Sequence, residues 1–316
     1  MWMVFRLPVT TDNYTFLSFD ASSASHKEYA ALNRHTNRMR LERPHDDPPV
    51  LLEETIQNLQ SIPSFVDLRL WAARTPGQNE ITALGNLSLM RTEENPHLAS
   101  FDISILPEHR RHGLARQMLR RITQAAEADQ RRLLMTNTVD RVPSGEAFLL
   151  RLGAQKDLVG HTNQLKIESL DRDLVARWLR QGEQNAADIE LSLWEGAYPE
   201  EHNLFARGNQ RWTFYIVDRA TGKFAGYTET VWNPNRPEQL RQDMTGVFPQ
   251  YRGKGLGRWL KAAMLDKVLR DRPQVKFVRT GNADSNAAML KINHAQGFEP
   301  YTADALWQIV LQKVQE

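Results

Sequence analysis

The chain of 316 residues contains no cysteine. Disulfide bonds, thiolate metal ligands and a cysteine nucleophile are therefore excluded, and so is an acyl-cysteine intermediate. The sequence also has no apolar run long enough to span a bilayer, and residues 1–8 lack the apolar core of a signal peptide. We therefore expect a soluble cytoplasmic protein with no membrane partner.

A strong excess of charge is also missing. The net charge is +2, from 40 basic and 38 acidic residues, so no large field favours nucleic acid or a lipid surface. The arginines at 120, 121, 131 and 132 are interpreted as a solvated helix face or as a cluster that steers an anionic ligand, and we expect no nucleic-acid partner. His109 and His112 have no third ligand nearby in the sequence, and we predict no metal site.

A duplicated pattern is present instead. Residues 103–116 read ISILPEHRRHGLAR, and residues 245–258 read TGVFPQYRGKGLGR. Arg110 aligns with Arg252, 142 residues later, and flanking strand-like and helix-ending segments repeat at nearly the same offset. A domain of about 150 residues is ordinary, so the pattern indicates duplication of a whole domain rather than a short-period repeat.

Hydrophobic periodicity predicts the same order of elements in both copies. In the first copy the predicted strands are 67–74, 80–90, 99–106, 132–137 and 161–167, with helices at 114–128 and 145–152. In the second copy the predicted strands are 212–217, 224–231, 242–248, 275–280 and 305–311, with helices at 256–269 and 285–295. Each copy is thus expected to close with its own last strand.

We place the domains at 1–168 and 187–316, with a connecting helix at 169–186. The second copy is shorter than the first, by about forty residues before its first common strand. Either it has lost its early helices, or a segment near Asn203 and Leu204 is missing from the sequence.

Both loops suit an anionic ligand. Glycines bring backbone N–H groups close to a ligand, and the following helix adds unpaired donors and the positive end of its dipole. In the second copy Arg252, Lys254 and Arg258 add full charges, so the loop favours a pyrophosphate. A plain strand-to-helix turn is the alternative. A P-loop would need Ser or Thr where Arg258 follows Gly257, and a Rossmann loop has a different glycine spacing.

The pattern Arg-x-x-Gly-x-Gly/Ala, between a strand with a proline and an amphipathic helix, resembles the acetyl-coenzyme A loop of the GNAT superfamily of N-acetyltransferases. The segment from Asn286 to Phe298, a helix followed by Gly-Phe, is similar to a later signature of that family. The tandem arrangement is loosely similar to that of mycothiol synthase, although no residue fixes that substrate.

The resemblance implies an α/β (α+β) fold with two tandem GNAT domains, each a mixed, mostly antiparallel twisted sheet flanked by helices. It implies acetyl-CoA as the cofactor and direct transfer of the acetyl group to a primary amine of a small molecule. A non-catalytic acyl-CoA-binding sensor or scaffold and a protein or peptide N-acetyltransferase are the alternatives. We expect a monomer or a homodimer.

The resemblance also implies which residues hold the cofactor. In the second copy they are Thr245, Gly246, Val247, Arg252, Gly253, Lys254, Gly255, Leu256, Gly257, Arg258 and Asn286. In the first copy they are Ile103, Ser104, Ile105, Arg110, Arg111, His112, Gly113, Leu114, Ala115 and Arg116.

The catalytic candidates lie in the second copy. Glu229 and Asp243 are candidate general bases on the strands nearest the loop, although an exposed strand glutamate and a strand-start aspartate are the simpler interpretations. Strand alternation would place Asp243 on one face with Thr245 and Val247. Asn293 stands where the family often has a tyrosine acid, so it could contact the sulfur but leaves the general acid unassigned.

We expect the second copy to be catalytic. It has three loop glycines, Glu229 and Asn286. The first copy has Ala115 in place of the third loop glycine and Leu149 at the acid position. We therefore expect the first copy to be catalytically degenerate, although its loop still suits coenzyme A.

Overall fold

A computed structural model describes residues 13–43, 47–196 and 208–311 of the chain. The predicted gap at Asn203 and Leu204 lies outside the described residues. The chain divides into two compact units. Unit 1 comprises Met1–Leu158 with Ala305–Glu316, and unit 2 comprises Val159–Asp304. Each unit is a mixed α/β structure, as the sequence predicts.

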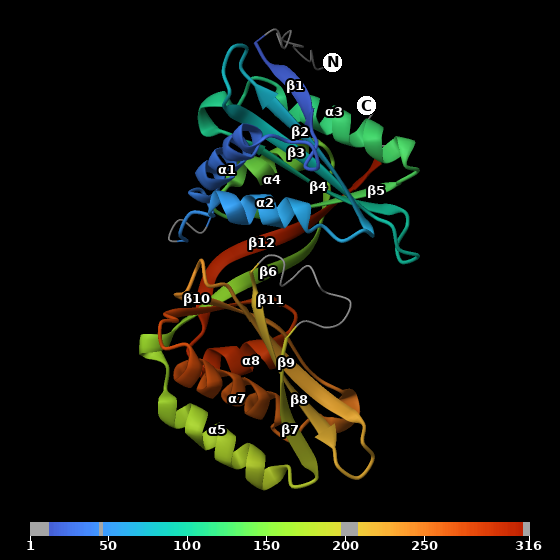
Figure 1. The fold of residues 1–316 in the computed structure, drawn as a ribbon. Helices are drawn as coiled ribbons and strands as arrows, with labels where there is room; N and C mark the ends of the chain where they lie inside the picture. The colour runs from blue at the N-terminus through green and yellow to red at the C-terminus, as the bar shows by residue number, and fades with distance from the viewer. Residues whose placement is uncertain (1–12, 44–46, 197–207, 312–316) are drawn as a thin grey trace. The chain divides into compact units, whose positions relative to one another are not determined.

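Unit 1 contains a mixed sheet with strand order β1-β2-β3-β4-β5-β12. The pairs β1/β2, β2/β3 and β3/β4 are antiparallel, whereas β4 and β5 are parallel. Its elements (Figure 1) are β1 Thr15–Phe19, α1 His26–Arg40, α2 Leu52–Gln60, β2 Val66–Arg74, β3 Ile81–Met90, β4 Leu98–Ile105, the 3-10 helix η1 Pro107–His109, α3 Leu114–Ala128, β5 Leu133–Val139, α4 Pro143–Arg151 and the later residues of β12 Glu299–Val310.

Unit 2 repeats this plan with strand order β6-β11-β10-β9-β8-β7. The neighbours β10 and β11 are parallel, whereas the pairs β6/β11, β9/β10, β8/β9 and β7/β8 are antiparallel. Its elements (Figure 1) are β6 Gln155–Lys166, η2 Ile167–Ser169, α5 Arg172–Asn185, β7 Ile189–Glu195, β8 Gln210–Asp218, β9 Phe224–Trp232, β10 Gln239–Val247, η3 Pro249–Tyr251, α7 Leu256–Asp271, β11 Phe277–Ala283 and α8 Ala287–Ala295.

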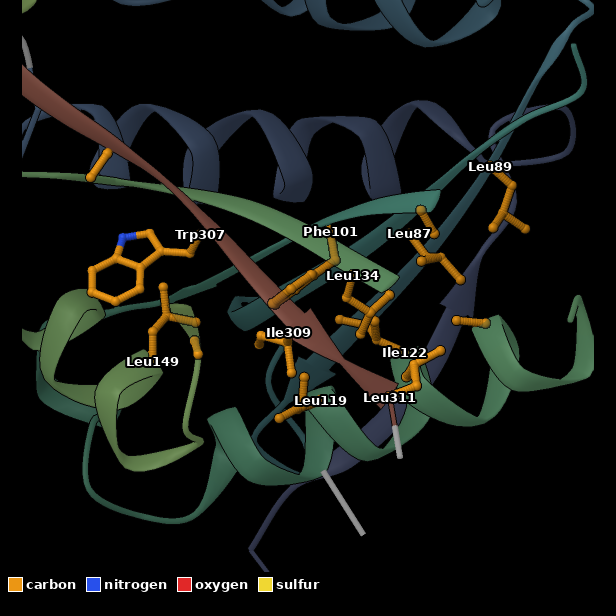
Figure 2. Packing of buried hydrophobic residues seen from close by; sticks show 14 residues of the cluster. Leu87, Leu89, Phe101, Leu119, Ile122, Leu134, Leu149, Trp307, Ile309 and Leu311 are labelled. Carbon is orange, nitrogen blue, oxygen red and sulfur yellow. The ribbon is translucent and has the colours of Figure 1, made fainter. Parts of the chain in front are cut away.

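The last strand of each sheet is not the predicted one. Strand β6 pairs with β11, and its Leu165 is buried in the core of unit 2. The end of β12 instead belongs to unit 1, where Trp307 and Ile309 are buried in one cluster with Leu134 and Leu149 (Figure 2). The prediction that each copy closes with its own strand is therefore wrong. Alternation identifies a strand, but it does not say which of two similar sheet edges the strand joins.

Helices cover both faces of the unit 1 sheet. Along β2, Leu70 and Ala72 belong to the cluster with α1 and α2, whereas Trp71 and Ala73 pack with α3. This follows from the alternation of side chains along a strand. Helix α3 approaches the sheet closely at Gly85, where a Cβ atom would lie 2.4 Å from a side-chain carbon of Met118.

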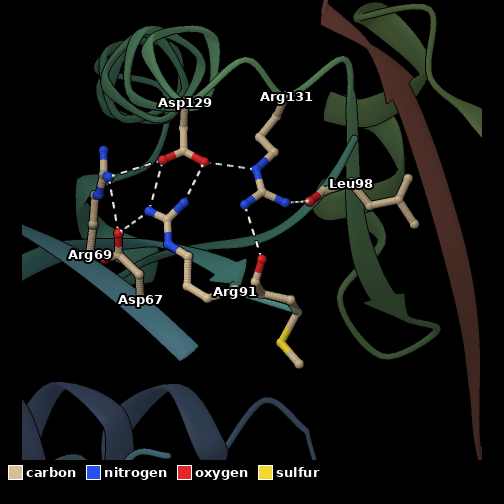
Figure 3. Close-up of polar contacts among 7 residues, drawn as sticks. Asp67, Arg69, Arg91, Leu98, Asp129 and Arg131 are labelled. Carbon is tan, nitrogen blue, oxygen red and sulfur yellow. Dashed lines mark hydrogen bonds and ion pairs between the residues drawn. The ribbon is translucent and has the colours of Figure 1, made fainter. Parts of the chain in front are cut away.

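A charged network links the end of β3 and the start of β4 to the turn between α3 and β5 (Figure 3). The buried Arg131 donates to the carbonyl oxygens of Leu98, at 2.9 Å, and Met90, at 3.0 Å. Asp129 accepts from Arg131 and Arg91, each at 2.9 Å. Hydrogen bonds from Arg91 and Arg131 lower the pKa of Asp129, so it stays ionised. The network holds the start of β4 beside the turn that leads into β5, the end at which the two parallel strands pair.

Candidate functional site

The two loops have the same backbone conformation. Helices α3 and α7 each begin after a left-handed glycine that provides no side-chain cap, Gly113 with φ 79° and Gly255 with φ 79°. Two positions earlier, each loop has another left-handed residue, Arg111 with φ 67° and Gly253 with φ 82°. The backbone N–H groups of each first turn are therefore left without a side-chain acceptor, which suits an anion.

The first arginine of each loop fixes the loop to the strand before it. Arg110 donates from Nε to the carbonyl oxygen of Ile105 at 3.1 Å, and Arg252 donates to that of Val247 at 2.9 Å. Arg110 also forms an ion pair with Glu42. These two arginines thus shape the loops, and other basic residues supply charge to the cavities.

In unit 1 the loop opens onto a cavity of about 420 Å³. Strands β4 and β5 pair from Leu98 to Ser100, and their later residues line the cavity. The predicted first-copy residues on its wall are Ile103, Ser104, Ile105, Arg110, Arg111, Gly113, Leu114, Ala115 and Arg116. His112 instead contacts the ring of Tyr14, with centroids 6.4 Å apart.

Elements on both faces of the sheet contribute residues to the wall of this cavity. Phe148 of α4 contributes to its wall, as do Met39 of α1 and Arg43, three residues after α1. Arg43 lies 3.5 Å from Asp102 of β4, which is also on the wall. The cavity therefore lies in the opening between β4 and β5 and reaches the α1 side.

In unit 2 the loop borders a cavity of about 390 Å³. Four predicted residues are on its wall, together with four residues of α5. They are Gly253, Lys254, Gly255 and Arg258, facing Trp178, Gln181, Gly182 and Asn185. The Arg258 guanidinium lies over the Trp178 ring, 5.5 Å from its centroid. Leu256 is buried in the core of the unit.

The model of the Acetyltransferase (GNAT) family matches residues 35–154 and 178–298. The chain belongs to the GNAT family of acetyltransferases. Both matched segments contain a loop and the helix that follows it, so the duplication is a duplication of the GNAT domain. The protein is an acyltransferase of the N-acetyltransferase class. Among curated proteins, no sequence matches this chain.

Solved GNAT structures share the fold over nearly the whole chain. A tandem GNAT protein from the clavulanic acid biosynthesis pathway, solved without acetyl-CoA, has a TM-score of 0.78 and 23% identity, covering 94% of this chain and 98% of that one. A GCN5-related N-acetyltransferase from Sphaerobacter thermophilus has a TM-score of 0.64 and 11% identity, covering 94% and 96%. A glucosamine N-acetyltransferase region of a fungal multi-domain β-N-acetylglucosaminidase has a TM-score of 0.63 and 11% identity, covering 94% and 38%.

The strand before the second GNAT loop contains a bulge. The register of β9 and β10 shifts between Gln242 and Thr245, so strand alternation does not hold there. The argument that Asp243 shares a face with Thr245 and Val247 is therefore wrong. Thr245 bonds to the hydroxyl of Thr228 at 2.7 Å, whereas Asp243 accepts from Arg241 at 2.9 Å.

Glu229 is buried rather than exposed. One of its carboxylate oxygens lies 3.8 Å from Nε of Arg211, which is also buried. A buried glutamate beside a buried arginine is typical of an internal ion pair. The role of Glu229 as a base stays a prediction.

Asn293 is fully buried in a polar contact within unit 2. Its side-chain oxygen accepts from Nζ of Lys261, and its Nδ2 donates to Asn282 at 2.7 Å. Burial lowers the pKa of Lys261 to about 7. Both ends of its amide are thus engaged inside the unit. The predicted contact of Asn293 with a sulfur atom stays a prediction.

Asn286 acts locally as a helix cap. Its side chain accepts from the backbone N–H of Met289 at 3.3 Å and caps α8. A cap of this kind stabilises a helix by about 1 kcal/mol. Its predicted contact with the cofactor stays a prediction.

Sequence reasoning missed His35. This histidine lies on α1 and is buried, with its Nε2 2.9 Å from Oγ of Ser104. Ser104 stands on the cavity wall. The partners are far apart in sequence, so no local motif could identify the pair.

The described residues contain no group of three or more His, Cys, Asp or Glu side chains arranged for a metal. His109 instead bonds through Nδ1 to the hydroxyl of Tyr14 at 3.0 Å. Within the same ranges, no helix is both long and apolar enough to cross a membrane.

Proposed function

We propose that this GNAT protein transfers an acetyl group from acetyl-CoA to a primary amine of a small molecule. The observation that carries this proposal is the unit 1 cavity, whose wall contains nine of the ten residues assigned to the cofactor in the first copy. A preformed cavity with a few convergent polar groups is the usual form of a ligand site.

The cavity fits the chemistry of acetyl-CoA. The uncapped N–H groups at the start of α3 and the side chains of Arg111 and Arg116 would hold the pyrophosphate. Residues 103–105 of β4, beyond its pairing with β5, would bind the pantetheine arm as a neighbouring strand does. Acetyl-CoA supplies the acyl group as an activated thioester.

The same assignment extends to the second copy. Gly253, Lys254, Gly255 and Arg258 surround a smaller cavity and would hold a second pyrophosphate. Residues 245–247 would bind the arm, with the N–H of Val247 as oxyanion donor. The sequence favours the second copy as the catalytic one, whereas the lining favours unit 1, because there the loop, residues 103–105 of β4 and residues on the α1 side all border one cavity.

Release of coenzyme A thiol, followed with a colorimetric thiol reagent, tests this function. The acceptors are ethanolamine, glycine, lysine, spermidine, tyramine and glucosamine, with an N-terminally free peptide as a comparison. We expect amine-dependent thiol release with at least one small amine and a slower rate with the peptide. Release with the peptide alone would favour peptide acetylation.

Binding without turnover is the second candidate, and internal contacts in unit 2 favour it for that unit. Glu229 is paired with Arg211, and Asn293 with Lys261, so the predicted catalytic groups are engaged. Tight coenzyme A binding without thiol release from any acceptor would support a sensor or scaffold. The cytoplasmic location and the monomeric or homodimeric state stay predictions.

A further inference from the structure

Ser104 and His35 form a buried pair at the wall of the unit 1 cavity. Ser104 Oγ lies 2.9 Å from Nε2 of His35. The other ring nitrogen, Nδ1, lies 2.8 Å from the carbonyl oxygen of Ile81 at the start of β3. His35 is only 1% exposed and is not on the cavity wall. Its hydrogen bond to the hydroxyl of Ser104 therefore connects it to the cavity.

The Ile81 carbonyl fixes the tautomer of this histidine. A carbonyl oxygen can only accept, so Nδ1 of His35 must carry a proton. In a neutral imidazole Nε2 then carries the lone pair, and the hydroxyl of Ser104 donates to it. The serine is thus oriented with its proton toward the ring and its lone pairs free for another donor.

The charged groups around His35 come from α1, β4 and the loop before β3. Burial lowers the pKa of His35, and Arg38 of α1 lowers it further. The Ile81 carbonyl, Asp102 of β4 and Glu80 act in the opposite direction. The net effect is a lowered pKa, so the ring is neutral at pH 7 and can accept a proton.

Ser104 faces the side of the sheet opposite the cofactor loop. Its strand neighbours Ile103 and Ile105 pack with α3 residues such as Met118, whereas Ser104 bonds to α1. A donor held by the loop before α3 and an acceptor entering from the α1 side would meet in the opening between β4 and β5. Ser104 lies on the wall of that opening.

We propose that Ser104 is a catalytic residue of unit 1 and that His35, acting through it, is the proton acceptor for the acyl transfer. The inference rests on the proposed function. The acceptor nitrogen forms a bond to the thioester carbonyl carbon and gives a proton to Ser104 Oγ, while the proton of Ser104 passes to His35 Nε2. The carbon–sulfur bond then breaks, and the proton held on His35 returns through Ser104 to the departing sulfur or to solvent, which balances the reaction.

The second copy lacks this hydroxyl. Gly246 stands where Ser104 stands in the first copy, 142 residues earlier. The relay therefore assigns the acyl transfer to unit 1. The sequence alone favours the other copy, because the first copy has Ala115 in its loop and Leu149 at the acid position. The relay consists of one serine and one histidine, and neither belongs to the Arg-x-x-Gly-x-Gly/Ala motif.

The variants Ser104→Ala and His35→Gln test the relay with the fastest amine of the acceptor panel. We expect kcat to fall by about 100-fold or more in each, as for the loss of a general base, with the coenzyme A dissociation constant unchanged by calorimetry. The double variant should be no slower than either single one, because the two residues act as a unit. Matched controls are Ser100→Ala on the same strand and His26→Gln on the same helix, both exposed positions, which should keep the wild-type rate.

The pH profile separates a chemical role from a structural one. Below the lowered pKa of His35, the slope of log kcat/KM against pH should rise from one, due to the acceptor amine, to two. In His35→Gln it should stay at one. Independently, long-range ¹H–¹⁵N NMR of the cofactor-free protein at pH 7 should show His35 protonated at Nδ1 and not at Nε2. Protonation at Nε2 would overturn the relay.

The outcomes distinguish the relay from the function on which it rests. No thiol release with any acceptor overturns the proposed function and the relay together. Release that Gly113→Glu abolishes, but that Ser104→Ala and His35→Gln leave within threefold of wild type, overturns the relay alone. Release that survives Gly113→Glu places the chemistry outside unit 1 and also overturns the relay.

Discussion

Arg111 adopts a left-handed backbone conformation that favours glycine. Its φ is 67°, and the second copy has Gly253 at the equivalent position with φ 82°. A non-glycine residue in this region costs roughly 1 kcal/mol. Arg111 lines the cavity. The strained backbone position therefore carries a cation beside the expected phosphate site.

Replacing Arg111 with glycine should therefore change the stability of the protein and its affinity for coenzyme A in opposite directions. We expect Arg111→Gly to raise the free energy of unfolding by up to about 1 kcal/mol and to weaken coenzyme A binding. Gly253→Ala is the matched control for the backbone strain, since nothing lies within 4 Å of the added Cβ, and it should lower the free energy of unfolding. Urea denaturation and calorimetry measure both effects. A less stable Arg111→Gly protein would contradict this account.

Lys261 and Asn293 stand in unit 2 where the first copy has the apolar pair Leu119 and Leu149. Burial lowers the pKa of Lys261 to about 7, below its value in an unfolded chain. Between about pH 7 and 10 the unfolded state therefore binds more protons, so stability rises with pH across this range and is lowest below pH 7.

The double variant Lys261→Leu with Asn293→Leu should remove that pH dependence. We expect it to be more stable than wild type at pH 6, by an amount of order 4 kcal/mol or less, with the difference shrinking toward pH 10. Urea denaturation at pH 6, 8 and 10 measures this. Equal pH dependence in the two proteins would show that Lys261 is not buried as described.

The loops are the elements that sequence predicted best. The glycines and the proline fix the turn, and the structure has the same dihedral pattern in both copies. The bulge in β10 was not predictable, because it depends on how Gln242 and Thr245 both reach Thr228 across the strand pair. The same limit applies to the His35–Ser104 contact, which depends on helix packing.

Strands β9 and β10 approach closely at Gly226. A Cβ atom there would lie 2.4 Å from the backbone oxygen of Gly246, on the segment assigned to the pantetheine arm. Gly226→Ala should separate the strands and lower the free energy of unfolding by about 1–3 kcal/mol. At Gly281 of β11 nothing lies within 4 Å of an added Cβ, so Gly281→Ala is the control. Equal stability of the two variants would contradict the close approach.

At the scale of the molecule, the two copies exchange their last strands. The residues of β12 that enter unit 1 bury Trp307, whose Nε1 donates to Thr138 Oγ1 at 2.8 Å. The sequence predicted both strands but assigned each to its own copy, since an alternating strand fits either sheet edge. The duplication could be predicted from the sequence, because the loop motif is local. The strand exchange could not be predicted, because pairing of strands depends on residues far apart in the chain.

Trp307→Ala should therefore destabilise the unit at the opposite end of the sequence. We expect a loss of about 3–5 kcal/mol in unit 1, seen as faster hydrogen exchange in α3 and β5. Helix α7 and strand β11 should exchange as in wild type. Selective loss of protection in α7 and β11 would contradict the exchange of strands.

The most direct test of the central claim is calorimetric titration of coenzyme A into the wild-type protein, Gly113→Glu and Gly255→Glu. The two glycines share φ 79° at equivalent helix starts, so the variants introduce the same strain and the same charge in the two loops. We expect Gly113→Glu to eliminate binding to the unit 1 cavity and Gly255→Glu to leave that binding intact. Unchanged coenzyme A binding in Gly113→Glu would contradict the assignment of this cavity to the cofactor.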